Sequence, residues 1–187
     1  MKGRMILASA SPRRSQLLQG LGFDFVVRPA HCDEQSDIRD GAALVRELSR
    51  RKALSVQAGA EDAVIAADTV VCLDGAVLGK PADEEEAFSM LARLSGREHT
   101  VYTGVTVRRG GLLRTRSEET RVFFRPLTPE EIRRYIATGE PMDKAGAYGI
   151  QGRGGTFVRR IEGDYYNVVG LPLCALCEML EEIGVDA

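Results

Sequence analysis

Hydrophobic and polar positions follow two periods along the chain, one typical of β-strands and one typical of α-helices. Apolar runs rich in β-branched residues predict strands at residues 5–8, 23–28, 64–73, 76–81, 99–107, 112–124, 157–161 and 165–169. Apolar residues that recur every three or four positions predict helices at residues 12–21, 42–58, 84–94, 129–138 and 171–184. Strands and helices therefore alternate along most of the chain, which is typical of an α/β protein.

Turn signals indicate which strands are neighbours in the sheet. Asp74-Gly75 favours a tight hairpin, and residues 108–111 form a glycine-containing loop between two longer strands. Thr128 opens a capping box with Glu131 and marks the start of a helix. Because consecutive strands are joined by hairpins, we expect a mixed sheet rather than a fully parallel one.

Composition limits the class of protein. The 187 residues suit a single domain over residues 1–187, and 44% hydrophobic with 28% charged residues fits an ordinary globular protein. A formal net charge of −2 offers no broad positive surface for a nucleic-acid polymer. Since no apolar run is long enough for a signal peptide or a membrane span, we expect no membrane partner and a cytoplasmic location.

The four cysteines do not indicate a zinc site. Cys32 and Cys72 are isolated, and Cys174 and Cys177 form one C-x-x-C motif without the second pair that zinc would need. We expect Cys174 and Cys177 to pack as small hydrophobic residues on the last helix, with Cys177 on its buried face.

Two arginines stand in the first turn of a predicted helix, in the segment Ser9-Ala10-Ser11-Pro12-Arg13-Arg14. The helix dipole is already positive there, so the pair becomes favourable only if an anion binds. Free backbone N–H groups, the Ser9 and Ser11 hydroxyls and the guanidinium groups of Arg13 and Arg14 together suit a phosphate. The alternative is that Ser11 caps the helix while both arginines face solvent.

Asp68 is the only charged residue in the segment VIAADTVVCL, which otherwise predicts a strand buried on both faces. A buried carboxylate needs a partner, because burial without one costs several kcal/mol. Asp68 is therefore a candidate for a metal ligand, a cation partner or a catalytic group. A salt bridge to Lys80, which an extended segment could bring beside the same strand, is the structural alternative.

Two further segments carry weaker signals. Asp33 and Glu34 offer the hard oxygen ligands that Mg²⁺ or Mn²⁺ prefers, whereas the preceding His31 and Cys32 do not make a site by themselves and are interpreted as solvated loop residues. The segment 142–155 is rich in glycine, which predicts irregular structure and allows the backbone to approach a ligand closely. Within it, Gln151 presents a donor and an acceptor on one flat amide.

Taken together, these segments resemble the Maf family of nucleotide pyrophosphatases. The motifs ASASPRRSQLL, AADTVV, LSGREHTVYTGV, GEPMDKAGAYGIQGRGG and YYNVVGLPL occur in the family's order over nearly the whole chain. The resemblance implies an elongated mixed α/β fold related to inosine-triphosphate pyrophosphatases, with two lobes around a central cleft, and often a homodimer. It also implies a nucleoside triphosphate as the substrate.

The resemblance assigns roles to individual residues. It implies that Asp68 is the catalytic base, and that Glu34 is the family's loop glutamate, which with Asp68 would serve a divalent cation, Mg²⁺ or Mn²⁺. The family's basic residues fall on Arg13, Arg14, Lys52 and Lys80. Members that hydrolyse dTTP and UTP look like this chain at three selectivity positions, which here are Arg13, Thr69 and Gln151.

The implied reaction is in-line attack of water on the α-phosphorus, with pyrophosphate as the leaving group. Two other functions stay open at this stage. One is a regulator of septum formation that senses a nucleotide without turning it over, and the other is a pyrophosphatase for purine nucleotides. Asp68 argues against a sensor, because a pocket that only binds a triphosphate gains nothing from an added buried negative charge. Thr69 has an alternative as well, since threonine is a common strand residue.

Overall fold

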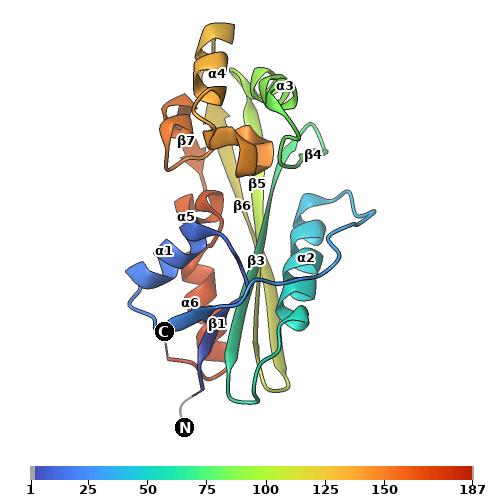
Figure 1. The fold of residues 1–187 in the computed structure, drawn as a ribbon, viewed down its shortest axis with the longest axis vertical. Coiled ribbons are helices and arrows are strands. Elements are labelled where there is room, and N and C mark those ends of the chain that lie inside the picture. The colour runs from blue at the N-terminus through green and yellow to red at the C-terminus, as the bar shows by residue number, and fades with distance from the viewer. Residues whose placement is uncertain (1–2, 187) are drawn as a thin grey trace.

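The computed structural model describes residues 3–186, and its centre is a seven-stranded mixed sheet (Figure 1). The strands are β1 (Met5–Leu7), β2 (Phe25–Val27), β3 (Ala63–Leu73), β4 (Ala76–Leu78), β5 (Glu98–Arg109), β6 (Leu112–Phe124) and β7 (Val158–Glu162). Their order is β2-β1-β3-β5-β6-β7, and β4 pairs separately with β3. Only β1 pairs in parallel, with β2 and with β3, so the mixed sheet expected from the hairpins is confirmed.

The helices cover both faces of this sheet. They are α1 (Pro12–Gly20), α2 (Gly41–Ser55), α3 (Glu84–Leu94), α4 (Pro129–Ile136), α5 (Tyr165–Val169) and α6 (Leu173–Glu182). Figure 1 shows α2 on one side of the long strands and α1, α5 and α6 on the other, while α3 and α4 lie at the opposite end of the molecule from the N-terminus. None of the helices in residues 3–186 is long and apolar enough to cross a membrane.

Two separate groups of buried side chains give the elongated molecule its two lobes. One group packs α3, α4 and the 3₁₀ segments against one end of β3, β5 and β6, around residues such as Leu91 and Phe124. The other packs α6 and α1 against β1 and the opposite end of β3 and β5, around Ile65 and Leu180. Because β3 and β5 run through both groups, these two long strands tie the lobes together and leave their middle segments for the site.

Local signals account for most of the element boundaries. Asp74 and Gly75 both have positive φ, 52° and 77°, as a tight hairpin of this hand requires. The side chain of Asp83 accepts a hydrogen bond from the backbone N–H of Glu86, and Thr128 forms its expected capping box at the start of α4. The segment 142–155 is irregular apart from short 3₁₀ turns, as its glycines predict.

The prediction of a strand at residues 165–169 is wrong, since these residues form the helix α5. Asp164 caps it by accepting a hydrogen bond from the N–H of Tyr166, and Gly170 ends it at φ 118°. Asn167 turns inward and is fully buried, and its amide donates to Val101 O and Thr120 Oγ1. The β-branched composition favours a strand, but the caps and this buried amide outweigh that preference.

The expectation for the C-x-x-C motif also needs correction. Cys174 is exposed and Cys177 is only partly buried, because α6 turns Ala175, Leu176 and Met179 toward the core. The helix is amphipathic as predicted, and Leu176 and Leu180 are buried as expected, but Ala175 and Met179 are buried in place of Leu173 and Cys177.

Candidate functional site

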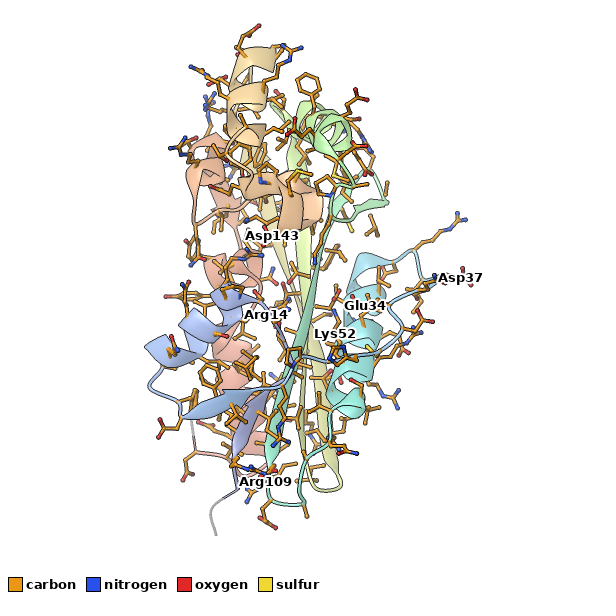
Figure 2. All side chains as sticks on the ribbon, viewed as in Figure 1. Arg14, Glu34, Asp37, Lys52, Arg109 and Asp143 are labelled. Carbon is orange, nitrogen blue, oxygen red and sulfur yellow. The ribbon has the colours of Figure 1, made fainter. Side chains whose placement is uncertain are left out.

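The candidate side chains, except that of Asp33, line one cavity of about 620 Å³, a volume typical of a small-molecule site. Asp33 lies outside this lining, and its carboxylate accepts from Gln35 N instead. One lobe contributes residues from the end of β1, the start of α1, α2 and β3, and the other contributes the segment 143–151. In Figure 2, Arg14, Lys52, Glu34 and Asp143 lie around the middle of the molecule, between the two lobes. The candidates in its wall are Ser9, Ser11, Arg13, Arg14, Glu34, Lys52, Asp68, Thr69, Lys80 and Gln151.

The cavity is locally positive although the whole chain is slightly negative. Its lining holds five cationic side chains and three carboxylates, a formal excess of two positive charges. The cations are Arg13, Arg14, Lys52, Lys80 and Lys144, and the carboxylates are those of Glu34, Asp68 and Asp143. Such a wall attracts a small polyanion and stabilises it with charge-assisted hydrogen bonds.

The start of α1 leaves backbone donors available to that anion. Ser11 is the N-cap residue, but its side chain makes no capping bond, and its own N–H donates to Ser9 Oγ over 3.2 Å. Within residues 3–186 the N–H groups of Arg13 and Arg14 have no hydrogen-bond partner. The interpretation of Ser11 as a simple side-chain cap is therefore wrong, and the helix N-terminus opens into the cavity.

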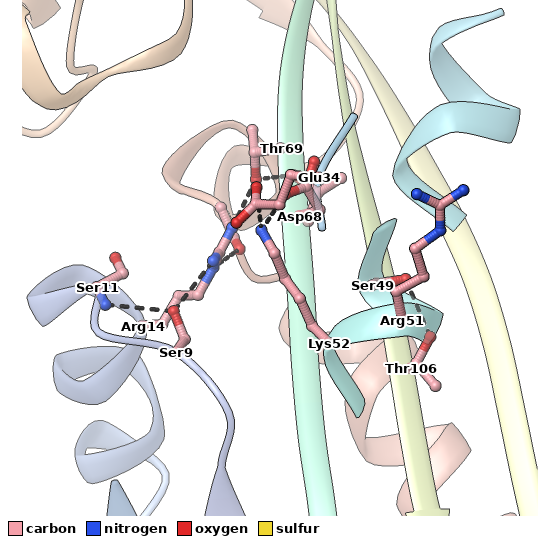
Figure 3. Close-up of polar contacts among 12 residues, drawn as sticks. Ser9, Ser11, Arg14, Glu34, Ser49, Arg51, Lys52, Asp68, Thr69 and Thr106 are labelled. Atoms are coloured by element: carbon pink, nitrogen blue, oxygen red, sulfur yellow. Dashed lines mark hydrogen bonds and ion pairs between the residues drawn. The ribbon is translucent and has the colours of Figure 1, made fainter. Parts of the chain in front are cut away.

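The Arg14 side chain points inward and links three segments of the cavity wall by hydrogen bonds (Figure 3). Its guanidinium donates to Gly170 O at 2.8 Å, to Ser9 Oγ at 3.1 Å and to Thr69 Oγ1 at 3.1 Å. Burial is the main reason that the pKa of Arg14 is lowered, and Asp68 opposes that shift. The solvent-facing alternative is therefore wrong for Arg14, and three of its five N–H groups are already used within the protein.

Thr69 continues this network into the sheet. Thr103 Oγ1 donates to the carbonyl of Asn167, so Thr69 Oγ1 must donate to Thr103 Oγ1 over 2.9 Å and accept from Arg14. The result is a directed chain of hydrogen bonds from the Arg14 guanidinium through the hydroxyls of Thr69 and Thr103 to the carbonyl of Asn167 in α5. Thr69 is thus more than a strand-forming residue, because its hydroxyl is a link in a buried polar network.

Asp68 is 8% exposed, and its partner is Lys52 rather than Lys80. Lys52 Nζ lies 2.5 Å from Asp68 Oδ1 and 2.9 Å from Glu34 Oε2, so one ammonium joins both carboxylates (Figure 3). This pairing offsets the cost of burying Asp68. Within residues 3–186 the second oxygen of Asp68 has no hydrogen-bond partner, so it can accept from a water molecule in the cavity.

Close packing of α2 on the sheet brings Lys52 to Asp68. Asp68 is paired across the sheet with Gly104, and a Cβ at Gly104 would lie 2.1 Å from the carbonyl oxygen of Val45 on α2. A buried hydrogen bond of 2.9 Å between Ser49 and Thr106 fixes the next turn of the helix on the same strand. Lys52 therefore reaches the carboxylate because a glycine lets the helix touch the strand.

Arg13 and Lys80 line the cavity without touching Asp68. Lys80 is exposed after the β4 hairpin, and the predicted salt bridge from Lys80 to Asp68 does not form. Arg13 Nη1 lies 3.3 Å from Asp143 Oδ2, and Lys144 Nζ lies 2.6 Å from Asp143 Oδ1. Burial raises the pKa of Asp143, but the hydrogen bond and charge of Lys144, together with Arg13, outweigh it and lower the pKa.

Gln151 is exposed and lines the cavity within the glycine-rich segment, on the same wall as Tyr148 and Lys144. The glycines were expected to let the backbone approach a ligand, but two of them contact side chains of the protein itself. A Cβ at Gly152 would lie 2.4 Å from Glu140 Oε1, and a Cβ at Gly149 would lie 2.7 Å from Lys144 Cε. The glycines are needed first because the loop folds against other side chains of the protein.

The residues fit a divalent cation in part. The carboxylates of Glu34 and Asp68 converge on one cation, Lys52 Nζ, and Mg²⁺ commonly uses one or two carboxylates plus substrate phosphates. Across residues 3–186, no group of three or more His, Cys, Asp and Glu side chains could hold a metal ion by itself. A metal bound here would therefore need oxygen ligands from the substrate or from water.

Comparison with known proteins agrees with this geometry. Residues 4–183 match the family described as Maf-like protein. The chain belongs to the Maf family. It is 53% identical to the dTTP/UTP pyrophosphatase of Pelotomaculum thermopropionicum, over 97% of both chains. It is 54% identical to the protein of the same name from Moorella thermoacetica, over 98% of this chain and 96% of that one, and 50% identical to the one from Thermococcus kodakarensis, over 97% of both.

Several residues of this Maf site were missed from the sequence. Asp143 and Lys144 are adjacent opposite charges in a glycine-rich segment, a pattern that could have marked them as site residues. No sequence pattern marks Thr103 or Asn167 as a site residue. Threonine is common in strands, and the apolar pattern around Asn167 predicts a strand as well. Their contribution depends on contacts between distant segments, which local patterns do not contain.

Proposed function

We propose that this Maf protein hydrolyses dTTP and UTP to the nucleoside monophosphate and pyrophosphate. The observation that carries the proposal is a nearly buried carboxylate, Asp68, in the wall of a cavity whose other charges are mostly positive. A cavity that only bound a triphosphate would gain nothing from this carboxylate, whereas one that activates water needs a proton acceptor. The names of the relatives support the same reaction.

In this proposal Asp68 orients and deprotonates the attacking water through Oδ2, the oxygen that faces no protein partner. Lys52 holds the other oxygen at 2.5 Å and so fixes the direction of the carboxylate. Arg13, Lys80 and the N–H groups at the start of α1 bind the phosphate oxygens and stabilise the negative charge that develops on the leaving pyrophosphate. Arg14 acts indirectly in this proposal, because its hydrogen bonds hold the Ser9 and Thr69 hydroxyls in place.

We propose that a divalent cation, Mg²⁺ or Mn²⁺, assists the reaction and that Glu34 and Asp68 supply its protein ligands. When bound, such an ion would neutralise phosphate charge. Lys52 contacts both of these carboxylates, so the ammonium and the cation would share the same two groups. The family resemblance further leads us to propose a cytoplasmic location and a homodimer, and analytical ultracentrifugation would test the assembly.

We also propose that Gln151 selects the base. A neutral amide can accept from the ring N–H and donate to the neighbouring carbonyl that uracil and thymine share. Cytosine reverses this donor and acceptor pattern. A donor–acceptor mismatch that the bound base covers should favour UTP over CTP by roughly 10²-fold or more. Purines are larger as well, so we expect dTTP and UTP to be preferred over CTP, GTP and ATP.

A panel of nucleoside triphosphates tests the proposal directly. Release of pyrophosphate and monophosphate would be measured for dTTP, UTP, CTP, GTP and ATP, with Mg²⁺, with Mn²⁺ and with a chelator. We expect pyrophosphate from dTTP and UTP and little activity in the chelator. Release of orthophosphate alone, or binding without turnover, would contradict the reaction.

The same panel separates the reaction from the selectivity. If GTP or ATP is turned over as well as UTP, Gln151 is not a pyrimidine reader, even though the pyrophosphatase reaction survives. The variant Gln151→Glu provides a second check. It should weaken the preference for UTP more than it slows the hydrolysis of UTP itself.

A further inference from the structure

Glu140 lies behind the glycine-rich loop and outside the cavity lining. Its carboxylate accepts three hydrogen bonds, from the Tyr135 hydroxyl at 2.9 Å, from Arg153 N at 3.0 Å and from Gly154 N at 3.2 Å. Two of these donors are backbone groups just after Gln151. A single side chain therefore holds the outgoing end of the segment that carries Gln151.

Tyr135 holds the incoming end of the same segment. Its hydroxyl accepts from Gly149 N at 3.1 Å while it donates to Glu140. The ring is 4% exposed and packs edge-to-face against Phe157, with 5.0 Å between the ring centroids. The segment of Gln151 is thus held on both sides by the Tyr135–Glu140 pair, of which Tyr135 belongs to the core of one lobe.

The backbone of residues 152–154 packs directly against Tyr135 and Glu140, which leaves little room for a side chain at Gly152 or Gly154. A Cβ at Gly152 would lie 2.4 Å from Glu140 Oε1, and a Cβ at Gly154 would lie 2.7 Å from the Tyr135 hydroxyl. Contacts of that length do not occur with real Cβ atoms, so a larger residue at Gly152 would displace the Glu140 carboxylate, and one at Gly154 would collide with the Tyr135 hydroxyl and the Gly149 backbone. The loop's path therefore follows the position of the Glu140 carboxylate closely.

The electrostatics of the carboxylate agree with this arrangement. Burial raises the pKa of Glu140, but the N–H groups of Arg153 and Gly154 and the Tyr135 hydroxyl outweigh it and lower the pKa. Lys144 adds a positive charge nearby and donates to the Glu140 carbonyl at 2.6 Å. An ionised carboxylate presents only acceptors, which is what three converging donors need.

We propose that Glu140 is a positioning residue for base selection, which holds Gln151 at the cavity through the backbone of residues 149–154. The inference rests on the proposed function of Gln151 as the base reader. Glu140 touches neither substrate nor water in this scheme. A side chain that never contacts the nucleotide thereby sets which nucleotide is accepted.

The variant Glu140→Gln tests the inference with little change in shape. One carboxylate oxygen becomes an NH₂ group, which cannot accept a hydrogen bond, so Arg153 N loses its partner if Oε2 is replaced, and the Tyr135 hydroxyl and Gly154 N lose theirs if Oε1 is replaced. We expect the ratio of kcat/KM for UTP to that for CTP to fall by roughly tenfold or more, with most of the loss in KM for UTP. Tyr135→Phe, which keeps the ring and removes both hydroxyl bonds, should move the ratio in the same direction and serves if Glu140→Gln folds poorly.

Two comparisons distinguish positioning from general destabilisation. The double variant Glu140→Gln with Gln151→Ala should show the same selectivity as Gln151→Ala alone, because Glu140 acts through Gln151. Glu131→Gln is the matched control. The Glu131 carboxylate lies at the start of α4, where it accepts from Arg125 and from the Thr128 N–H and not from the segment 149–154. This variant should lower stability without changing the UTP to CTP ratio.

Hydrogen exchange gives a readout that does not depend on turnover. In Glu140→Gln the amides of Arg153 and Gly154 should exchange faster than in the wild type, while the amides of β5 stay unchanged. Unchanged exchange would overturn the inference, and so would faster exchange with an unchanged UTP to CTP ratio. Selectivity lost in Gln151→Ala but kept in Glu140→Gln overturns this inference alone. Selectivity kept in Gln151→Ala overturns the base-reading function and this inference with it.

Discussion

Replacing Gly104 by alanine tests whether the contact between α2 and β5 positions the Lys52–Asp68 ion pair. The added Cβ would lie 2.1 Å from the carbonyl oxygen of Val45 and 2.4 Å from its carbon. To reach a separation of 3.0 Å, helix and strand must move apart by about 1 Å, because a packed interior has no slack to absorb the atom. Both contacting atoms belong to the backbone, so no side-chain rotation relieves the overlap.

This displacement has two measurable consequences. Overpacking of this kind destabilises a protein by about 1–3 kcal/mol, which urea denaturation would detect as a lower midpoint with an unchanged slope. Lys52 lies two turns beyond Val45 on α2, and its 2.5 Å contact with Asp68 would lengthen. Since a misplacement of about 1 Å in a site can cost roughly 10²-fold in rate, we expect UTP hydrolysis to fall by that order.

Gly20→Ala is the control for this prediction. No atom lies within 4 Å of a Cβ at Gly20, which ends α1. Alanine there should leave the unfolding midpoint and UTP hydrolysis nearly unchanged or raise stability slightly. If Gly104→Ala matched Gly20→Ala in both measurements, the close packing of α2 would not be what positions Lys52.

Three further predictions concern the charges of the site and the core. Asp68→Asn should keep the fold but lower UTP turnover by at least roughly 10²-fold, and near-normal turnover would remove Asp68 from the mechanism. Arg13→Ala and Lys80→Ala should each lower kcat/KM for UTP by roughly tenfold or more. The control variant Arg93→Ala should leave kcat/KM unchanged, because Arg93 is exposed on α3 and lies outside the cavity. Equal effects at all three positions would refute the assignment of Arg13 and Lys80 as phosphate-binding residues. Burial lowers the pKa of His99 to about 4, so between pH 6.5 and pH 4 the unfolded chain binds a proton that the folded protein excludes. Stability should therefore fall as the pH drops through that window, by up to about 3 kcal/mol, and the loss should be smaller in urea denaturation of His99→Phe; equal losses in both proteins would contradict the assignment.

Much of the fold follows from local patterns that can be read in the sequence. The hairpin at Asp74-Gly75 and the capping box at Thr128 depend on residues within a few positions of each other, and both are present. The strand β3 follows from an apolar run interrupted only by Asp68 and Thr69, which is typical of a strand buried on both faces. The family follows as well, because its motifs are contiguous and occur in order.

The candidate site was predicted less completely. The sequence marked Asp68 as a buried charge in need of a partner, since apolar neighbours make such a residue stand out. It could not show that the partner is Lys52, because that contact depends on the crossing of α2 over β5 at Gly104. Lys80 was equally plausible from sequence distance alone.

Tertiary structure alone decided how the interior polar groups are shared. Arg14 is buried by contacts with Thr69 and Gly170, which are 55 and 156 residues away in the chain. Asn167 turns a β-branched segment into a helix through its bonds to β5 and β6. A local pattern records the preferences of neighbouring residues, whereas a buried hydrogen bond is a choice among all the groups that folding brings within about 3 Å. The sequence therefore determined most of the elements and the family of this protein, and the packing of those elements decided the state of residues 165–169 and which charges meet.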